Sequence, residues 1–275
     1  MATESVRPPA FAGLFYEASA TALRRDVEAC LAPAASETSQ ASEASEVGRP
    51  LKALIAPHAG YVYSGPVAGS VYRLLAAQRA TIRRIVLLGP AHRVAIAGLA
   101  LPGDDYLATP LGTVRVDKAA VAEISSLPQV TVSREAHAGE HSLEVELPFL
   151  QVALDDFSVV PLVVGRAGAE AVAEVLERLW GGEETLLVVS SDLSHYLSYD
   201  EARRRDRHTA DRILALDATL SPHDACGCEP INGLLTAAAR RGLTADLVDL
   251  RNSGDTAGDR DRVVGYAAVA FCQGR

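Results

Sequence analysis

Apolar runs of strand length alternate with stretches of helical spacing over most of the chain. KALIAPH and RRIVLLGP are two such runs, and GPVAGSVYRLLAAQ between them has helical spacing and begins at a glycine. This order predicts a β-α-β unit, whose two strands are parallel. Before it, residues 19–32 have the pattern of a helix, whereas residues 33–50 are rich in Ala, Ser and Glu without apolar periodicity. We therefore expect a mobile surface loop over 33–50.

The rest of the chain continues the alternation. Extended segments around turns are expected within 95–116, followed by helices in DKAAVAEISSL and HSLEVELPFLQVAL. FSVVPLVVG and ETLLVVSSD, on either side of the helical AGAEAVAEVLERLW, are typical of strands buried on both faces. Helices near 200–217 and 229–242 precede two closing strands, TADLVDLRN and DRVVGYAAVAFCQ, which could be antiparallel at the sheet edge. The pattern predicts one α/β domain over residues 1–275, a three-layer α/β/α fold with a mostly parallel, mixed central sheet.

Composition and charge narrow the class of protein. With 48% hydrophobic and 22% charged residues, the chain of 275 residues can bury a large core. A formal net charge of -9 argues against nucleic-acid and membrane partners, because both require basic surfaces. We find no secretory signal pattern and no apolar run long enough to span a bilayer, so we expect a cytoplasmic protein. Four irregularly spaced cysteines predict free thiols and no disulfide framework.

Three histidines follow apolar strands in the same way. His58, His92 and His195 each come at or just after the C-terminal end of a predicted strand, the edge at which sites form in open α/β sheets. Each one alone could be a loop histidine satisfied by solvent. Together they predict a polar pocket, and imidazole is a common ligand of zinc, copper and iron. Asp192, three residues before His195, could orient an imidazole by a hydrogen bond or could cap a helix, as could Ser190.

Cys226 precedes the predicted helix that has Pro230 in its first turn. A thiol at a helix N-terminus has a lowered pKa, which favours the nucleophilic, metal-binding thiolate. The alternative is a buried inert cysteine, and Cys30 and Cys272 suit it because apolar residues surround them. For Cys228 the sequence leaves both interpretations open.

The remaining histidines are less informative. His141 and Glu144, three residues apart in AHAGEHSLEVELPFL, are candidates for the pocket wall, although the segment lacks the zinc-protease order of residues. We expect His137 to be exposed, and His208 and His223 to be solvated surface residues. Motifs for dinucleotide binding, for a phosphate-binding P-loop and for a serine nucleophile elbow are absent from the sequence.

Several segments together resemble one known family. RPPAFAGLFYEAS, APHAGYVYSG, LGPAH, EHSLEVELPFLQ, SSDLSHY and CGCEPI look like the Memo family, which includes protein B of the bacterial AmmeMemoRadiSam system. The resemblance runs from about Arg7 to the C-terminus. It implies a fold similar to that of class III extradiol dioxygenases, which are non-haem iron enzymes.

The resemblance also implies site residues. It assigns the family's pocket histidines to His58, His92 and His195, and its pocket cysteine to Cys226. Asp192 lies in the matching SSD segment. Phe15 and Tyr196 occupy pocket-wall positions at which vertebrate members carry tryptophan.

Our leading hypothesis is a metal-dependent redox protein. His58, His92 and Cys226 would bind iron or copper, with His195 as an acid-base group or further ligand supported by Asp192. Dioxygenases use a carboxylate ligand where this chain has a cysteine, so we do not expect this protein to share their ring-cleaving activity. One alternative is a non-catalytic module that binds a peptide, a small molecule or a protein, in a complex with a radical S-adenosylmethionine enzyme. Another is a metal-free thiol hydrolase that uses Cys226 and a histidine.

Overall fold

The computed structural model describes residues 4–33 and 50–274. Residues 34–49, nearly all of the segment for which a mobile loop was predicted, lie outside the described residues. The α-helices are α1 (Ala20–Leu31), α3 (Tyr61–Tyr72), α4 (Lys118–Ile124), α5 (Arg134–Ala138), α6 (Leu147–Ala153), α7 (Ala169–Arg178), α8 (Tyr199–Leu214) and α9 (Cys228–Arg241). Short 3-10 helices are η1 (Arg73–Gln78), η2 (Glu144–Glu146) and η3 (Ser253–Asp255).

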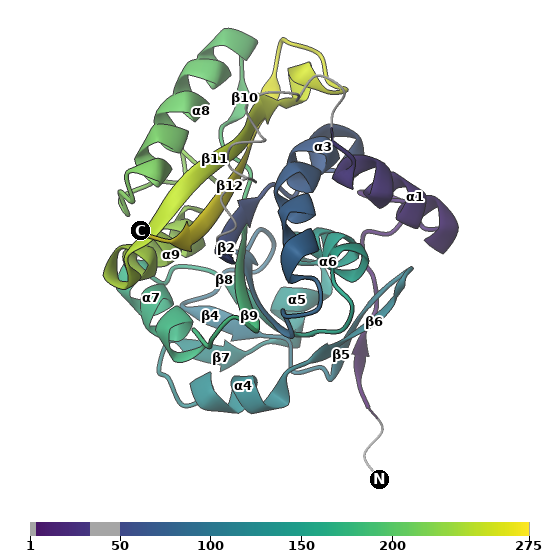
Figure 1. Ribbon diagram of the computed structural model, residues 1–275, viewed down its shortest axis with the longest axis vertical. Coiled ribbons are helices and arrows are strands. Elements are labelled where there is room, and N and C mark those ends of the chain that lie inside the picture. The colour runs from purple at the N-terminus through teal and green to yellow at the C-terminus, as the bar shows by residue number, and fades with distance from the viewer. Residues whose placement is uncertain (1–3, 34–49, 275) are drawn as a thin grey trace.

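Across the described residues, twelve strands join in one mixed sheet (Figure 1). They are β1 (Val6–Arg7), β2 (Leu51–Ala56), β3 (Arg84–Pro90), β4 (Leu99–Leu101), β5 (Tyr106–Thr109), β6 (Gly112–Val116), β7 (Val130–Val132), β8 (Ser158–Val164), β9 (Thr185–Ser190), β10 (His195–Leu197), β11 (Leu243–Asn252) and β12 (Val263–Gln273). The main order is β1-β5-β6-β8-β3-β9-β2-β12-β10. Its centre, β8-β3-β9-β2, is parallel throughout, which confirms the predicted class of sheet.

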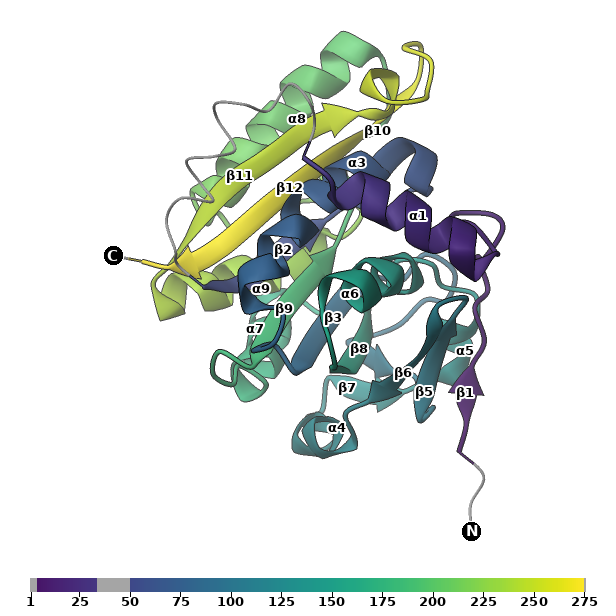
Figure 2. The ribbon, with the colours of Figure 1, turned by 45° about the vertical axis from the view of Figure 1, so that its right-hand side comes forward.

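The two closing strands form an antiparallel pair, as the sequence suggested. β12 does not lie at an edge, however, because it also pairs antiparallel with β2. β11 therefore lies outside β12, and α8 runs alongside β11 (Figures 1 and 2). The apolar character of β12 follows from this position, since it has sheet neighbours on both sides and is buried over most of its length.

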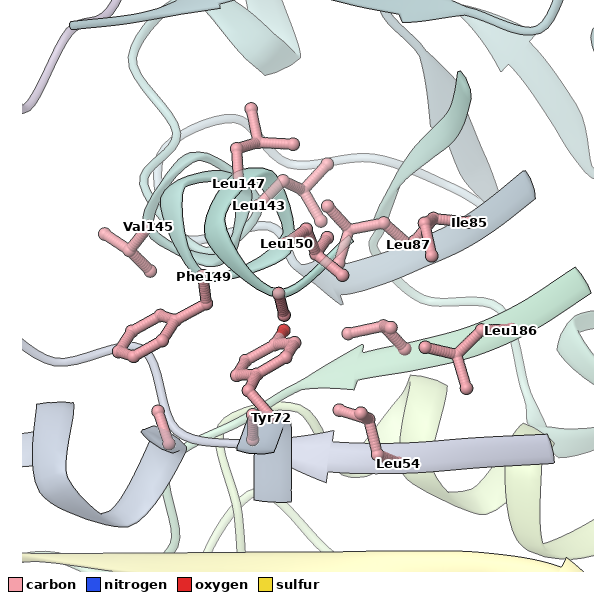
Figure 3. Close-up of a cluster of buried hydrophobic side chains, with 14 of the residues drawn as sticks. Leu54, Tyr72, Ile85, Leu87, Leu143, Val145, Leu147, Phe149, Leu150 and Leu186 are labelled. Atoms are coloured by element: carbon pink, nitrogen blue, oxygen red, sulfur yellow. The ribbon is translucent and has the colours of Figure 1, made fainter. Parts of the chain in front are cut away.

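Alternation of side chains along the central strands builds two hydrophobic clusters, one on each face of the sheet. In β2, Leu54 belongs to the cluster that includes residues of α1, α3 and α6, whereas Ile55 belongs to the cluster with α4, α7 and α9. Figure 3 shows part of the first cluster, where the ring of Tyr72 stacks on Phe149 with centroids 5.1 Å apart. The predicted three-layer arrangement is confirmed.

The parallel centre also fixes where polar side chains gather. β2, β9 and β3 are neighbours in that order and point the same way, so the segments after Ala56, Ser190 and Pro90 leave the sheet at one edge. None of the helices in the described ranges has both the length and the apolar character needed to cross a membrane.

Candidate metal centre

His58 and His92 leave the sheet on either side of the end of β9, and the structure brings their rings to a centroid distance of 5.2 Å. A third ring, that of His141, lies beside them. One ring nitrogen from each of the three histidines falls within 4.8 Å of the other two. Such a group of three imidazoles is able to hold a metal ion.

His141, which the sequence suggested for the pocket wall, is thus part of the histidine group. It lies in the turn between α5 and η2, and its ring stacks on His92 with centroids 4.6 Å apart and planes 19° apart. The turn packs directly against β3 at Gly89, where a Cβ atom would lie only 2.7 Å from Ser142 Oγ. Gly89 is therefore required for the close approach of the segment that supplies His141.

Glu140, which sequence reasoning did not select, holds His92 in place. Its Oε1 lies 2.8 Å from His92 Nδ1 and also accepts from the backbone N–H groups of His141 and Ser142. Burial by itself would raise the pKa of Glu140, but the hydrogen bonds from His92 and Ser142 outweigh it and lower the pKa to about 2. The carboxylate is thus ionised and keeps the proton of His92 on Nδ1, which leaves Nε2 free for a ligand.

The orientation of His58 follows from counting hydrogens around Ser190. Ser190 Oγ lies 2.7 Å from His58 Nδ1, 2.6 Å from Ser142 O and 2.9 Å from Glu146 Oε1. Because a carbonyl oxygen only accepts, the single hydroxyl hydrogen of Ser190 goes to Ser142 O. His58 Nδ1 and Glu146 must then both donate to Ser190 Oγ, so Glu146 carries a proton.

Other features agree with a neutral Glu146. The side chain is fully buried, and burial raises the pKa of Glu146 to about 8. Its second oxygen accepts from Tyr72 Oη at 2.8 Å. No motif in the sequence marks Glu146 as part of the site, because it lies in an apolar stretch and contacts His58 only through Ser190. Its effect is to place the hydrogen of His58 on Nδ1 and the lone pair on Nε2.

His58 and His141, which are less exposed than His92, are neutral at ordinary pH. Burial, and then the neighbouring His141, His92 and His195 rings, lower the pKa of His58 well below its usual value. Burial likewise lowers the pKa of His141 to about 4. Neutral imidazole is the form that binds metals, so these side chains need not lose a charge-bearing proton on binding.

Cys226 adjoins the histidine group. Its Sγ lies 3.3 Å from His58 Nε2, and Gly227 follows it with no room for a side chain, because a Cβ there would lie 2.7 Å from Ser191 Cβ. The expectation of a lowered thiol pKa was wrong: burial and then the Asp192 carboxyl raise the pKa of Cys226 to about 12. Desolvation of the thiolate outweighs the dipole of α9.

Asp192 supports His58 through the backbone. Its Oδ1 accepts from the His58 N–H at 2.8 Å, so the prediction that its carboxyl orients an imidazole is replaced by a role in shaping the loop after β2. His195 is exposed, and Tyr196 beside it has a φ of 60° and lies with its ring under Arg262. Solvent reaches both residues, and the charge of His195 is near enough to His58 to lower the pKa of that ring further.

The N-terminal segment covers the other side of His141. Phe15 packs on the His141 ring with centroids 4.7 Å apart. Glu144 is buried, and instead of facing the histidines it accepts from Arg7 Nη1 at 2.7 Å, from the Phe11 N–H at 2.8 Å and from Tyr16 Oη at 2.5 Å. It therefore fastens the N-terminal segment against the turn that carries His141.

The histidines outside the cluster differ in their surroundings. His208 and His223 are exposed, as predicted. His137 is only 2% exposed, against our expectation, and its Nε2 lies 2.7 Å from Ala100 O. A hydrogen bond to a backbone carbonyl accounts for its burial. Of the remaining cysteines, Cys228 and Cys272 are buried and Cys30 is half-buried.

The surroundings of His141 Nδ1 indicate whether the site suits a metal ion. His141 Nδ1 is buried and has no hydrogen-bond partner among the described residues, although Glu140 Oε1 lies 3.3 Å away. That oxygen already accepts from three N–H groups and is not aligned with the ring nitrogen. A buried imidazole with an unsatisfied nitrogen beside two others matches what a metal ligand requires.

Comparisons with known proteins identify the family of this chain. The model of the family described as Memo-like protein matches residues 7–270. The chain is 36% identical to a MEMO1 family protein of Methanothermobacter thermautotrophicus, covering 96% of this chain and 100% of that protein. It is 37% identical to one of Archaeoglobus fulgidus, covering 97% of this chain and 99% of that protein.

A solved structure shares the fold. The crystal structure of an uncharacterized protein from Escherichia coli K12 superposes with a TM-score of 0.52 at 15% identity, covering 80% of this chain and 99% of that one. At this identity the likeness concerns the fold alone. The family match and the curated relatives extend over nearly the whole chain. The chain therefore belongs to the Memo-like protein family.

Proposed function

We propose that this Memo-like protein is a metal-dependent redox protein whose ion is iron or copper. The observation that carries the proposal is the group of three imidazoles within 4.8 Å, formed by His58, His92 and His141. Cys226, whose Sγ adjoins His58 Nε2, would be a further donor after losing its proton. His141 thereby becomes a ligand in this proposal, in addition to the His58, His92 and Cys226 set that the sequence suggested.

The chemistry of the donors supports these metals. Imidazole suits zinc, copper and iron, whereas thiolate favours softer ions and changes the potential of a redox metal. When bound, iron or copper would supply a one-electron couple next to a solvent-reachable side chain. The carboxylate that iron dioxygenases use is replaced by a thiol, so we do not propose ring cleavage.

The protein's own residues have defined tasks in this proposal. Glu140 and Ser190 fix the two Nδ1–H tautomers, so that His92 and His58 present Nε2 to the ion. Phe15, packed on His141, excludes water from one side. His195, which solvent reaches, would exchange protons with a substrate or with solvent.

The test is metal loading of the full chain. Protein purified anaerobically without chelator is incubated with Fe(II), Cu(I) or Zn(II), desalted and analysed for metal content. We expect about one equivalent of iron or copper per chain, and loss of most of it in His58→Ala and His141→Ala. His208→Ala is the matched control, because His208 is exposed on α8 and should leave the metal content unchanged.

The redox part of the proposal has a separate readout. Electron paramagnetic resonance of the loaded protein should show reversible change of oxidation state on alternate addition of ferricyanide and dithionite. Failure of the wild type to bind any of the three metals would overturn the whole proposal. Binding of zinc alone, or metal that does not change oxidation state, would overturn the redox function while leaving a metal site.

A further inference from the structure

Polar side chains are buried without partners next to the turn that carries His195. Ser194 Oγ, Asp206 Oδ2 and Thr209 Oγ1 are buried, and none of them has a hydrogen-bond partner among the described residues. Asp206 and Thr209 lie three residues apart on α8, and Ser194 directly precedes β10. α8 packs against both β10 and β12 (Figures 1 and 2). A carboxyl group kept inside the protein at this cost calls for an explanation, and the contacts of its other oxygen supply one.

The other oxygen of Asp206 holds the backbone of Ser194. Asp206 Oδ1 accepts from the Ser194 N–H at 3.0 Å, and Asp206 is only 2% exposed. Gly265 of β12 also fixes this segment, because its N–H donates to Ser194 O at 2.8 Å and its carbonyl accepts from the Leu193 N–H at 2.8 Å. A Cβ atom at Gly265 would lie 2.0 Å from Asp206 Oδ2, so the carboxyl group packs directly on the backbone of β12. Ser194 is thus hydrogen-bonded to both α8 and β12.

The turn that follows Ser194 has a strained backbone. Tyr196 has a φ of 60°, which residues other than glycine rarely adopt. The pairing of β10 with β12 is irregular at the same place, between His195 and Leu197. The side chain of Tyr196 is largely exposed, so burial of its ring does not account for this conformation. A strained backbone persists only where its neighbours fix it, and the hydrogen bonds to Ser194 are therefore what keeps His195 in place.

His195 is close enough to the histidine group for its position to affect both. Burial and the neighbouring histidines, His195 among them, lower the pKa of His58. Desolvation lowers the pKa of His195, a hydrogen bond with the Leu193 backbone raises it, and the neighbouring His92 lowers it, with a net decrease. The proton affinity of His195 thus depends on where the turn holds its ring.

We propose that Asp206 is a positioning residue, whose buried carboxyl group holds the Ser194 N–H and thereby directs His195 towards the histidine group. This task rests on the proton exchange proposed for His195, because Asp206 acts only through the turn that carries that ring. Burial raises the pKa of Asp206 to about 6, although hydrogen bonds with Ser194 lower it, so the carboxyl group is mostly ionised at about pH 7.5. An ionised acceptor strengthens the hydrogen bond from the Ser194 N–H.

Two substitutions separate the position of His195 from the charge beside it. Asp206→Asn and Asp206→Ala both remove the negative charge, but only asparagine keeps an oxygen that accepts from the Ser194 N–H. NMR titration of metal-free, full-length protein with isotope-labelled histidine gives the pKa of each ring, and His195→Gln identifies the signal of His195. We expect the pKa of His195 to be at least roughly 0.3 pH unit higher in Asp206→Ala than in Asp206→Asn, because the ring leaves its desolvated surroundings and His92.

Ile213→Ala is the matched control for a general loss of stability. Ile213 is fully buried on the same helix, so its truncation destabilises α8, but it makes none of the hydrogen bonds that hold Ser194. It should leave the pKa of His195 at the wild-type value. Circular dichroism verifies the fold of each variant. If Asp206→Ala does not fold, Asp206→Ser takes its place, because the serine hydroxyl is too short to reach the Ser194 N–H.

Metal loading gives an independent readout. Asp206→Ala should bind as much metal as the wild type, because Asp206 is not part of the group formed by His58, His92 and His141. Since the titration uses metal-free protein, failure of the wild type to bind metal would overturn the proposed function and leave the test of Asp206 intact. Positioning by Asp206 would be overturned by an equal pKa of His195 in Asp206→Ala and Asp206→Asn, or by an equal change in Ile213→Ala. Loss from Asp206→Ala of metal that the wild type binds would also overturn it.

Discussion

Glu140 makes two hydrogen bonds to His92. One carboxylate oxygen lies 2.8 Å from the ring Nδ1 of His92, and the other accepts from the backbone N–H of His92 at 2.7 Å. The ring and the backbone of His92 are thus held by a single buried anion. This relationship ties the loop after β3 to the turn that supplies His141. A substitution of Glu140 therefore tests directly whether this hydrogen bonding holds the cluster together.

Glu140→Gln keeps the shape of the side chain but replaces one of its two acceptor oxygens by an NH₂ group. Because both oxygens accept from N–H groups, this new donor would face another donor. The free energy of unfolding should fall by about 1–3 kcal/mol, measured by urea denaturation of the metal-free protein. Metal affinity should fall roughly ten- to hundredfold. Glu123→Gln, on the exposed side of α4, is the control and should change neither. Unchanged metal affinity in Glu140→Gln would contradict the assigned role.

Glu146 should make stability depend on pH. Its pKa is about 8 in the folded protein against an ordinary value of 4.5, so the folded state holds a proton that the unfolded chain loses. The contribution is fully present below about pH 4.5 and is lost as pH rises towards 8, because the unfolded state binds fewer protons in that interval. Wild type should therefore lose stability over this interval relative to Glu146→Gln.

The glutamine variant is informative because its amide can donate to Ser190 Oγ and accept from Tyr72 Oη, as the protonated acid does. Subtracting its pH–stability curve from that of the wild type isolates the titration of Glu146 from that of other buried groups. Glu146→Ala, which can do neither, should be destabilised at every pH. A flat difference curve would show that Glu146 is ionised throughout.

Cys226 should react slowly as a free thiol. With a pKa of about 12, almost none of it is thiolate at pH 8. Alkylation by iodoacetamide, followed peptide by peptide in the mass spectrometer, should be at least about tenfold slower at Cys226 in folded metal-free protein than in urea. Fast alkylation would instead favour the thiol-hydrolase alternative.

Gly89 should tolerate no side chain. In Gly89→Ala the added Cβ would meet Ser142 Oγ at 2.7 Å and Leu143 Cδ2 at 2.9 Å, which forces the turn away from β3. We expect a loss of about 1–3 kcal/mol in the free energy of unfolding. Gly139→Ala is the control, because a Cβ atom added at Gly139 would have nothing within 4 Å and the φ of -113° suits any residue. Equal effects of the two substitutions would refute the steric argument.

The fold was predictable because buried parallel strands leave long apolar runs in the sequence. The same runs located His58 and His92, since the end of a strand is visible as the end of its run. The place of β12 was not predictable in this way: pairing with both β2 and β11 is a matter of register between distant segments. Apolar residues alone do not distinguish an inner strand from an edge strand.

The site was only partly predictable. Glu140 and His141 lie in a turn, and their position depends on the close packing of that turn against Gly89. The pKa of Cys226 depends on burial, which outweighs the helix dipole and has no local signature. Similarly, His137 is buried by a contact with Ala100, a residue 37 positions away.

The order in which the cluster's parts occur along the chain has a consequence for its assembly during synthesis. Phe15 is near the beginning, Cys226 is past residue 220, and β2, which leads to His58, pairs with β12 at residues 263–273. A nascent fragment that stops before Cys226 lacks that donor, and one that stops before residue 263 also lacks the strand that pairs with β2. The full set of donors can therefore hold an ion only after synthesis has passed Cys226, which places metal binding behind most of the folding of the parallel strands.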